Sequence, residues 1–134
     1  MTRAFFDSNI LVYAFTNDDA RQERALELLA IGGTISVQCL NEFASVTRRK
    51  LGMDWKRIHT ALEEIRDLCR TIMPLDLDTH IRGIELVQHY KLSVYDGMIV
   101  AAALAADCDT LYSEDMHAGL VVNGRLTVVN PFAP

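Results

Sequence analysis

Four acidic residues that are far apart in the sequence each lie beside a short apolar segment. Asp7 directly follows the first such segment, and Asp115 comes shortly after a later one. Glu42 lies near the start of a predicted helix that follows a second strand, and Asp96 lies near the start of a strongly apolar helix. Because functional sites in parallel α/β sheets lie at the carboxyl ends of the strands, we expect the four side chains to converge.

Clustered carboxylates would restrict the chemistry of such a site. Like charges within a few ångströms raise one another's pKa and destabilise the fold, so a cluster is tolerated mainly when a cation neutralises it. No His or Cys lies at ligand spacing beside these acids, and oxygen ligands alone favour a hard ion, Mg²⁺ or Mn²⁺. Such an ion typically binds phosphate oxygens and activates a water molecule for in-line attack. The acids are therefore candidate catalytic residues and metal ligands.

Each acid also has an ordinary structural explanation. Asp7 could cap a short helix, and residues 93–96 resemble a capping box that ends in Asp96. Glu42 could lie on a solvated helix face, and Asp115 could belong to a turn. Taken singly, these explanations are preferred, and only convergence of the four acids favours a metal site.

The elements that would position these residues alternate between short strands and helices. Strands are predicted at residues 4–6, 34–37, 71–75, 110–113 and 126–129. Helices are predicted at residues 10–15, from 18 to a stop at 32–33, at 38–50, from a cap at 54, from a cap at Asp78 or Thr79, and at 94–106. This alternation predicts a three-layer α/β/α sandwich with a central, mainly parallel sheet of about five strands. Without a linker or repeat, residues 1–134 are predicted to form a single domain.

Composition excludes several classes of protein. Half of the residues are apolar and 23% are charged, so the chain can bury a core and is not disordered. The net charge of −5 excludes a polycation that coats nucleic acid. Three widely spaced cysteines without a Cys-x-x-Cys pair are typical of reduced thiols in a cytoplasmic protein. The most apolar window, 98–106, is shorter than the roughly 20 residues that a membrane helix needs, so no membrane association is expected.

Four sequence motifs resemble those of a known family. Residues 6–11 (FDSNIL), 41–43 (NEF), 94–103 (VYDGMIVAAA) and 111–116 (LYSEDM) are similar, in the same order, to the motifs of PIN-domain ribonucleases. The similarity is closest to the VapC toxins of bacterial toxin–antitoxin pairs and covers essentially the whole chain, including the closing segment 130–132. Four motifs in order make this a specific resemblance.

The resemblance implies roles for particular residues. Asp7, Glu42, Asp96 and Asp115 would form the acidic tetrad, with Asp7 and Asp96 as direct ligands and the other two acting directly or through water. Asn9 and Ser113 match positions that hydrogen-bond the acids. The sequence departs from the pattern at Glu114, which adds a fifth acid beside Asp115, and the Ser-x-Asp spacing favours Asp115 as the inward-facing one.

The function implied by the resemblance is that of a Mg²⁺-dependent endoribonuclease. It would hydrolyse RNA phosphodiester bonds as the toxin of a toxin–antitoxin pair, form a homodimer and be blocked by a small antitoxin protein. The alternative is a catalytically silent module of the same fold that binds protein or RNA. A haloacid-dehalogenase-like phosphatase is disfavoured because it needs a second Asp where this sequence has Asn9.

A local basic patch offers a candidate RNA contact. Five basic residues between positions 48 and 57 accompany only one acid there. They form either a solvated helix end, where cations suit the helix dipole, or a contact to an RNA backbone, with Arg48, Arg49 and Lys50 as candidate RNA-binding residues. Trp55 in the same segment is predicted to anchor the core or an interface rather than to stack on a base.

Overall fold

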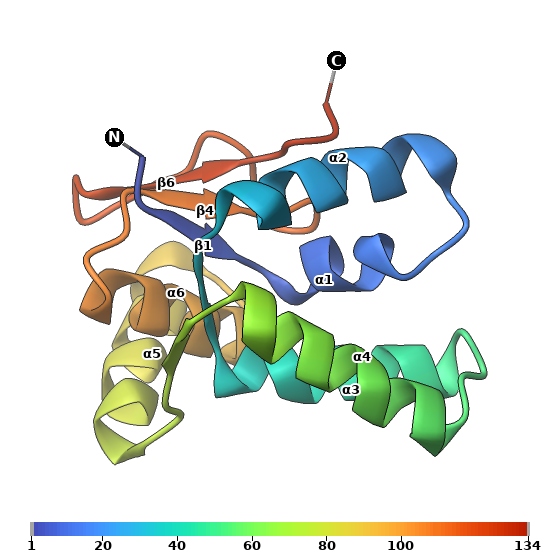
Figure 1. Ribbon diagram of the computed structural model, residues 1–134. Helices are drawn as coiled ribbons and strands as arrows, with labels where there is room; N and C mark the ends of the chain where they lie inside the picture. Colours follow the sequence, from blue (N-terminus) through green and yellow to red (C-terminus); the bar gives the residue numbers. More distant parts are fainter. Residues whose placement is uncertain (1, 134) are drawn as a thin grey trace.

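A six-stranded sheet runs through the centre of the computed structural model, which describes residues 2–133. The strand order is β3-β2-β1-β4-β6-β5, and every pairing is parallel except that of β5 with β6. The strands are β1 (Ala4–Phe6), β2 (Thr34–Ser36), β3 (Thr71–Met73), β4 (Thr110–Tyr112), β5 (Val121–Val122) and β6 (Leu126–Val129). Figure 1 shows β1, β4 and β6 pointing the same way, toward the end of the sheet where α1 begins.

Six helices flank this sheet within the described residues, so the predicted three-layer α/β/α sandwich is confirmed. They are α1 (Ser8–Ala14), α2 (Asp19–Ile31), α3 (Val37–Arg49), α4 (Trp55–Leu68), α5 (Leu77–Tyr90) and α6 (Val94–Ala105). The helix α6 is buried from Gly97 to Ala103, as its apolar sequence predicts. None of the helices between residues 2 and 133 combines the length and apolarity that crossing a membrane requires.

The sheet has one strand more than the predicted five. The additional strand, β5, has only two residues and pairs antiparallel with β6 through Val122 and Leu126. The connection is the Asn123-Gly124 turn, whose φ angles of 53° and 65° are both positive. Asn and Gly tolerate this conformation best, so the turn closes a hairpin between β5 and β6. A two-residue strand is too short to be predicted from its own sequence pattern.

Two smaller predictions need correction. The cap of α5 is Asp76, whose Oδ1 accepts a hydrogen bond from the Thr79 N–H at 2.9 Å, and not Asp78 or Thr79. The helix α5 buries only Gly83 and Leu86, so its Ile81 is exposed. Trp55 is also exposed and so does not anchor the core of this chain.

The helices α5 and α6 approach each other unusually closely next to Asp96. A Cβ atom at Gly97 would lie 2.5 Å from Val87 Cγ2 and 2.7 Å from the carbonyl oxygen of Gly83. A Cβ atom at Gly83 would in turn lie 2.5 Å from Met98 Cε. The two glycines therefore let the helix backbones touch where α6 begins, and this contact fixes the start of the helix that carries Asp96.

Candidate active site

Asp7 lies at the carboxyl end of β1, where it also caps α1. Its Oδ1 accepts a hydrogen bond from the Ser8 N–H at 2.7 Å. Its Oδ2 accepts hydrogen bonds from Ser113 Oγ at 2.7 Å and from Asn9 Nδ2 at 3.3 Å. Only 3% of the residue is exposed. The capping explanation is therefore correct for Asp7, and it coexists with a position inside the acidic cluster.

Glu42 projects from α3 toward the same end of the sheet. Ser8 Oγ donates a hydrogen bond to its Oε1 at 2.8 Å, and Gln38 Nε2 donates one to its Oε2 at 3.0 Å. Sequence reasoning did not assign a site role to Ser8 or Gln38. The position of Gln38 four residues before Glu42, on the same helix face, is the signal that could have identified it.

Asp96 and Asp115 complete the set of four acids. Asp96 lies in the first turn of α6, where its backbone N–H donates to Ser93 Oγ at 3.1 Å, as the capping box predicts. Asp115 follows β4, and its Oδ2 accepts a hydrogen bond from Asn9 Nδ2 at 3.2 Å. Since Asn9 also donates to Asp7, one amide links the carboxylates of two distant segments.

The fifth acid, Glu114, points into a different environment. Tyr13 donates its hydroxyl to one carboxylate oxygen, and Arg21 Nε donates to the other at 2.9 Å. Burial, together with the Glu114 carboxylate, raises the pKa of Tyr13 to about 12. The Arg21 guanidinium also lies over the rings of Tyr13 and Phe132, at 5.4 Å and 5.8 Å. Asp115, and not Glu114, therefore accompanies the other acids.

A groove of about 600 Å³ runs between α3 and the start of α6, and we call it the acidic groove. Glu42, Asp96 and Asp115 line it, together with Ser8. The backbone N–H of Ser8 donates a hydrogen bond to Asp7, and its Oγ donates one to Glu42. Its other lining residues are Gln38, Asn41, Ser45, Val46, Arg49, Ser93 and Tyr95. The structure thus brings together all four acids that the sequence singled out, at the strand ends where parallel sheets form their sites.

Burial and mutual repulsion disfavour negative charge in this cluster. Burial raises the pKa of Asp7 from 3.8 to about 7, and the charges of Glu42 and Asp96 add to this effect although hydrogen bonds from Ser113 and Ser8 oppose it. The pKa of Asp96 is also raised, first by burial and then by Glu42 and Asp115. A bound cation would offset both effects.

The donor set fits a hard divalent ion. Every candidate ligand is a carboxylate, and burial, together with neighbouring negative charges, raises the pKa values of Asp7 and Asp96. Between residues 2 and 133, however, no three His, Cys, Asp or Glu side chains already lie together in metal-binding positions. An ion would therefore have to draw the carboxylates closer than Asn9, Ser8 and Gln38 hold them here.

The predicted basic patch divides into separate surfaces. Arg48 Nη1 donates to the Met53 carbonyl at 3.1 Å, and its guanidinium lies 5.3 Å from the centre of the Trp55 ring. Arg49 instead lines the acidic groove, with its Nε donating to Ser45 Oγ at 3.0 Å. Lys50 caps the end of α3 and does not line the groove. Of the three candidates, only Arg49 lies beside the acids.

If Arg49 contacts an RNA phosphate, Arg49→Ala should weaken RNA binding and flatten its dependence on salt, because that contact would be lost. The slope of log affinity against log salt should fall by about 0.7 for a single-stranded RNA. Arg48→Ala is the matched control and should leave the slope unchanged. Filter binding across a salt series measures both variants, and an unchanged slope for Arg49→Ala would assign the residue to the solvated helix end.

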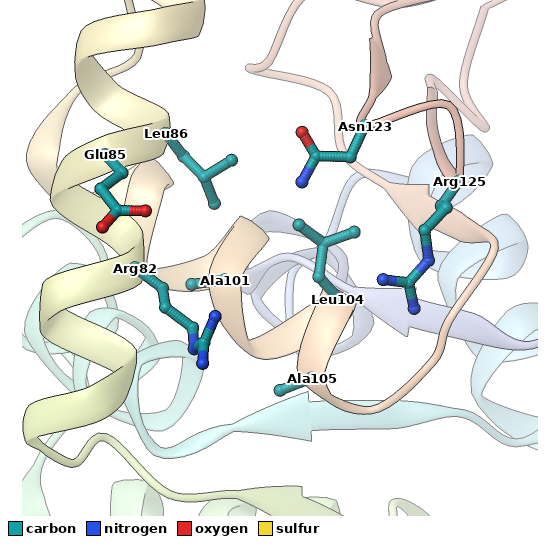
Figure 2. A pocket seen from close by; sticks show the side chains of 8 residues that line it. All are labelled: Arg82, Glu85, Leu86, Ala101, Leu104, Ala105, Asn123 and Arg125. Carbon is teal, nitrogen blue, oxygen red and sulfur yellow. The ribbon is translucent and has the colours of Figure 1, made fainter.

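A second cavity, of about 390 Å³, lies between α5, α6 and the β5–β6 hairpin. Figure 2 shows Arg82 and Arg125 projecting toward it from opposite sides, with Leu104 between them. Both arginines are already paired, Arg82 with Asp78 at 2.9 Å and Arg125 with Asp107 at 2.8 Å. None of the four acids lines this cavity, so the acidic groove remains the candidate active site.

Comparison with known proteins decides the family. The model of the PIN domain family matches residues 4–118, which include all four acids of the cluster. The chain belongs to the PIN domain family. This result confirms the resemblance carried by the four sequence motifs. No match was found among curated protein sequences.

Solved structures from toxin–antitoxin systems share this fold. A chain of a toxin–antitoxin complex from Klebsiella pneumoniae is 23% identical, with a TM-score of 0.70 and coverage of 96% of this chain and 97% of that chain. VapC20 of Mycobacterium tuberculosis, a toxin that cleaves the sarcin-ricin loop, is 22% identical, with a TM-score of 0.68 and coverage of 84% and 89%. VapBC2 of Rickettsia felis, bound to promoter DNA, is 23% identical, with a TM-score of 0.61 and coverage of 85% and 89%.

Proposed function

We propose that this PIN domain is a Mg²⁺- or Mn²⁺-dependent endoribonuclease and the toxin component of a toxin–antitoxin pair. One observation carries the proposal. Four carboxylates from four separate segments converge at one end of the sheet, and three of them line a groove large enough for part of an RNA strand. Stability alone gives no reason to gather like charges in this way.

The proposed metal ligands are Asp7 and Asp96, with Glu42 and Asp115 acting directly or through water. A bound Mg²⁺ or Mn²⁺ would stabilise negative charge on the phosphate and lower the pKa of a water molecule. The protein orients these carboxylates before any ligand binds. Asn9 and Ser113 hold Asp7, Asn9 also holds Asp115, and Ser8 with Gln38 holds Glu42. These hydrogen bonds fix the starting position of each carboxylate, and a bound ion would draw the carboxylates together from those positions.

The partners are part of the same proposal. Likeness to toxins in complex with antitoxins supports a small antitoxin protein that blocks the groove, and likeness to an RNA-cleaving toxin supports RNA as the substrate. We further propose that residues 1–134 act as one domain, that the protein works as a homodimer, and that it acts in the cytoplasm, where its three free cysteines stay reduced.

The substitution Asp96→Asn distinguishes a metal site from a helix-capping acid by stability alone. If the acids repel one another, the substitution should raise the melting temperature in EDTA and reduce the stabilisation that added Mg²⁺ provides. If Asp96 only serves the helix dipole, the variant loses about 0.3–1 kcal/mol, and its melting temperature falls by a few degrees. The cap itself survives in both cases, because Ser93 Oγ accepts from the backbone of residue 96.

The alternative function, a catalytically silent module of the same fold, is favoured by one observation. Within the part of the chain that the structure describes, no three metal-ligating side chains are preassembled. Incubation of the purified protein with RNA in Mg²⁺ or in EDTA separates the two functions. Cleavage that requires Mg²⁺ supports the nuclease, whereas binding without cleavage in either condition supports the module.

A further inference from the structure

The acidic groove contains an aromatic side chain that the proposed chemistry does not use. Tyr95 lies in the first turn of α6, directly before Asp96, and 65% of it is exposed. Within residues 2–133 its ring makes no ring–ring contact, and its hydroxyl makes no hydrogen bond. A single exposed aromatic residue is ordinary on a protein surface, so what matters is that Tyr95 lines the groove beside the acids.

The α3 side of the groove carries Glu42, several neutral side chains and one cation. Asn41, Ser45 and Arg49 recur every four residues along α3, so they form one row on the groove side of that helix. Arg49 takes part in none of the ion pairs found between residues 2 and 133, although acids line the same groove. Its guanidinium is therefore available to an anion that enters from outside.

These two walls match the parts of one nucleotide. An aromatic ring offers a stacking surface for a base. A guanidinium that is not ion-paired offers charge, and its remaining N–H groups offer hydrogen bonds, to the adjacent phosphate. A stacking contact also contributes affinity where the unfilled acidic cluster would repel the phosphate backbone. A base can reach such a ring only when it is unstacked, which excludes a base held inside a duplex.

We propose that the acidic groove binds single-stranded RNA with one base stacked on Tyr95 and the neighbouring phosphate held by Arg49. The proposal rests on the proposed function, and it adds the residues that would contact one base and its neighbouring phosphate. Tyr95 would act as a positioning residue, because its place next to Asp96 sets the bound phosphate against the carboxylates.

Binding in the absence of metal tests this proposal without any cleavage. The probe is a short, fluorescently labelled single-stranded RNA of mixed sequence, titrated in EDTA at low ionic strength and followed by anisotropy. Tyr95→Ala should raise the Kd at least about fivefold, which is the lower range for loss of one stacked base. Tyr95→Phe keeps the ring and should stay within about twofold of the wild type, whereas Tyr95→Leu should bind as weakly as Tyr95→Ala.

Two controls make the result specific to stacking. Trp55 is an aromatic residue with 54% exposure that does not line the groove, so Trp55→Ala should not change the Kd. An oligonucleotide of the same sequence with abasic sites should bind the wild type and Tyr95→Ala equally, since no base remains to stack. Unchanged melting temperatures for the Tyr95 variants, expected from the exposure of the side chain, confirm that each one is folded.

Three results would each overturn the proposal. They are unchanged RNA binding by Tyr95→Ala, wild-type affinity of Tyr95→Leu, and no binding of the RNA by the wild type in EDTA. A wild-type protein that binds RNA through Tyr95 and never cleaves it in Mg²⁺ would overturn only the nuclease. A wild-type protein that cleaves RNA while Tyr95→Ala binds and cleaves normally would overturn only the stacking contact. For the active enzyme, Tyr95→Ala should raise KM more than it lowers kcat, because uniform binding is lost.

Discussion

Asp7→Asn should lower the rate of Mg²⁺-dependent RNA cleavage by at least about 100-fold, the scale expected when several kcal/mol of metal-derived transition-state stabilisation are lost. The fold should survive, because the amide oxygen of Asn can still accept from the Ser8 N–H and so keep the cap of α1. Cleavage of a labelled RNA, followed with time in a nuclease-free preparation, measures the effect.

The matched control for this experiment is Glu63→Gln, which removes an exposed acid on α4 outside the groove. It should retain nearly all of the wild-type rate. Circular dichroism of both variants verifies that they are folded. If Asp7→Asn keeps most of the activity that depends on Mg²⁺, Asp7 is not a metal ligand and its role is limited to capping α1.

The metal-free protein should lose stability as the pH rises from about 4 to 7. The pKa of Asp7 is raised from 3.8 to about 7, first by burial and then by Glu42 and Asp96. Between these two pH values the folded state holds a proton that the unfolded state has released, so the free energy of unfolding falls with rising pH. The full change is on the order of 4 kcal/mol for a shift of this size, and the raised pKa of Asp96 acts in the same direction.

Urea denaturation in EDTA at pH 5 and pH 8 measures the part of this change that lies above pH 5, about 3 kcal/mol. Asp7→Asn should make the two values more similar, because the neutral amide does not titrate. Added Mg²⁺ should restore stability to the wild type at pH 8, since an ion that binds only the folded state stabilises it by mass action. Equal stability of the wild type at both pH values in EDTA would show that the pKa of Asp7 is not raised in the folded protein.

The positions of the acids were predictable because they follow from a general rule of parallel sheets. Short apolar segments mark the ends of strands, and the residues that follow them meet at one edge. This reasoning located Asp7, Glu42, Asp96 and Asp115 without any knowledge of their distances. The Ser-x-Asp spacing favoured Asp115 over Glu114, but the contacts that hold Glu114 elsewhere come from Arg21 and Tyr13, which are far away in the sequence.

The basic patch shows where sequence reasoning was too coarse. Consecutive residues on a helix are about 100° apart, so Arg48 and Arg49 necessarily face different surroundings. The identity of those surroundings, the Met53 carbonyl and Trp55 for one and the groove for the other, depends on tertiary packing. The strand β5 was missed for a similar reason, since two residues carry no periodic signal and gain strand structure only by pairing with β6.

The contact between Gly83 and Gly97 limits how this protein can be engineered for thermal stability. Replacing a helical glycine by alanine normally stabilises a helix by up to about 1 kcal/mol, and it is a routine step in making enzymes more heat-resistant. At these two positions a methyl group would lie 2.7 Å from the carbonyl oxygen of Gly83 or 2.5 Å from Met98 Cε. A methyl group at Gly97 would push against the Gly83 backbone and force the helices apart next to Asp96, whereas one at Gly83 would first displace the flexible end of Met98. A consensus or library approach should therefore keep both glycines fixed and look for stabilising changes on the outer face of α5, where Leu77 and Ile81 are exposed.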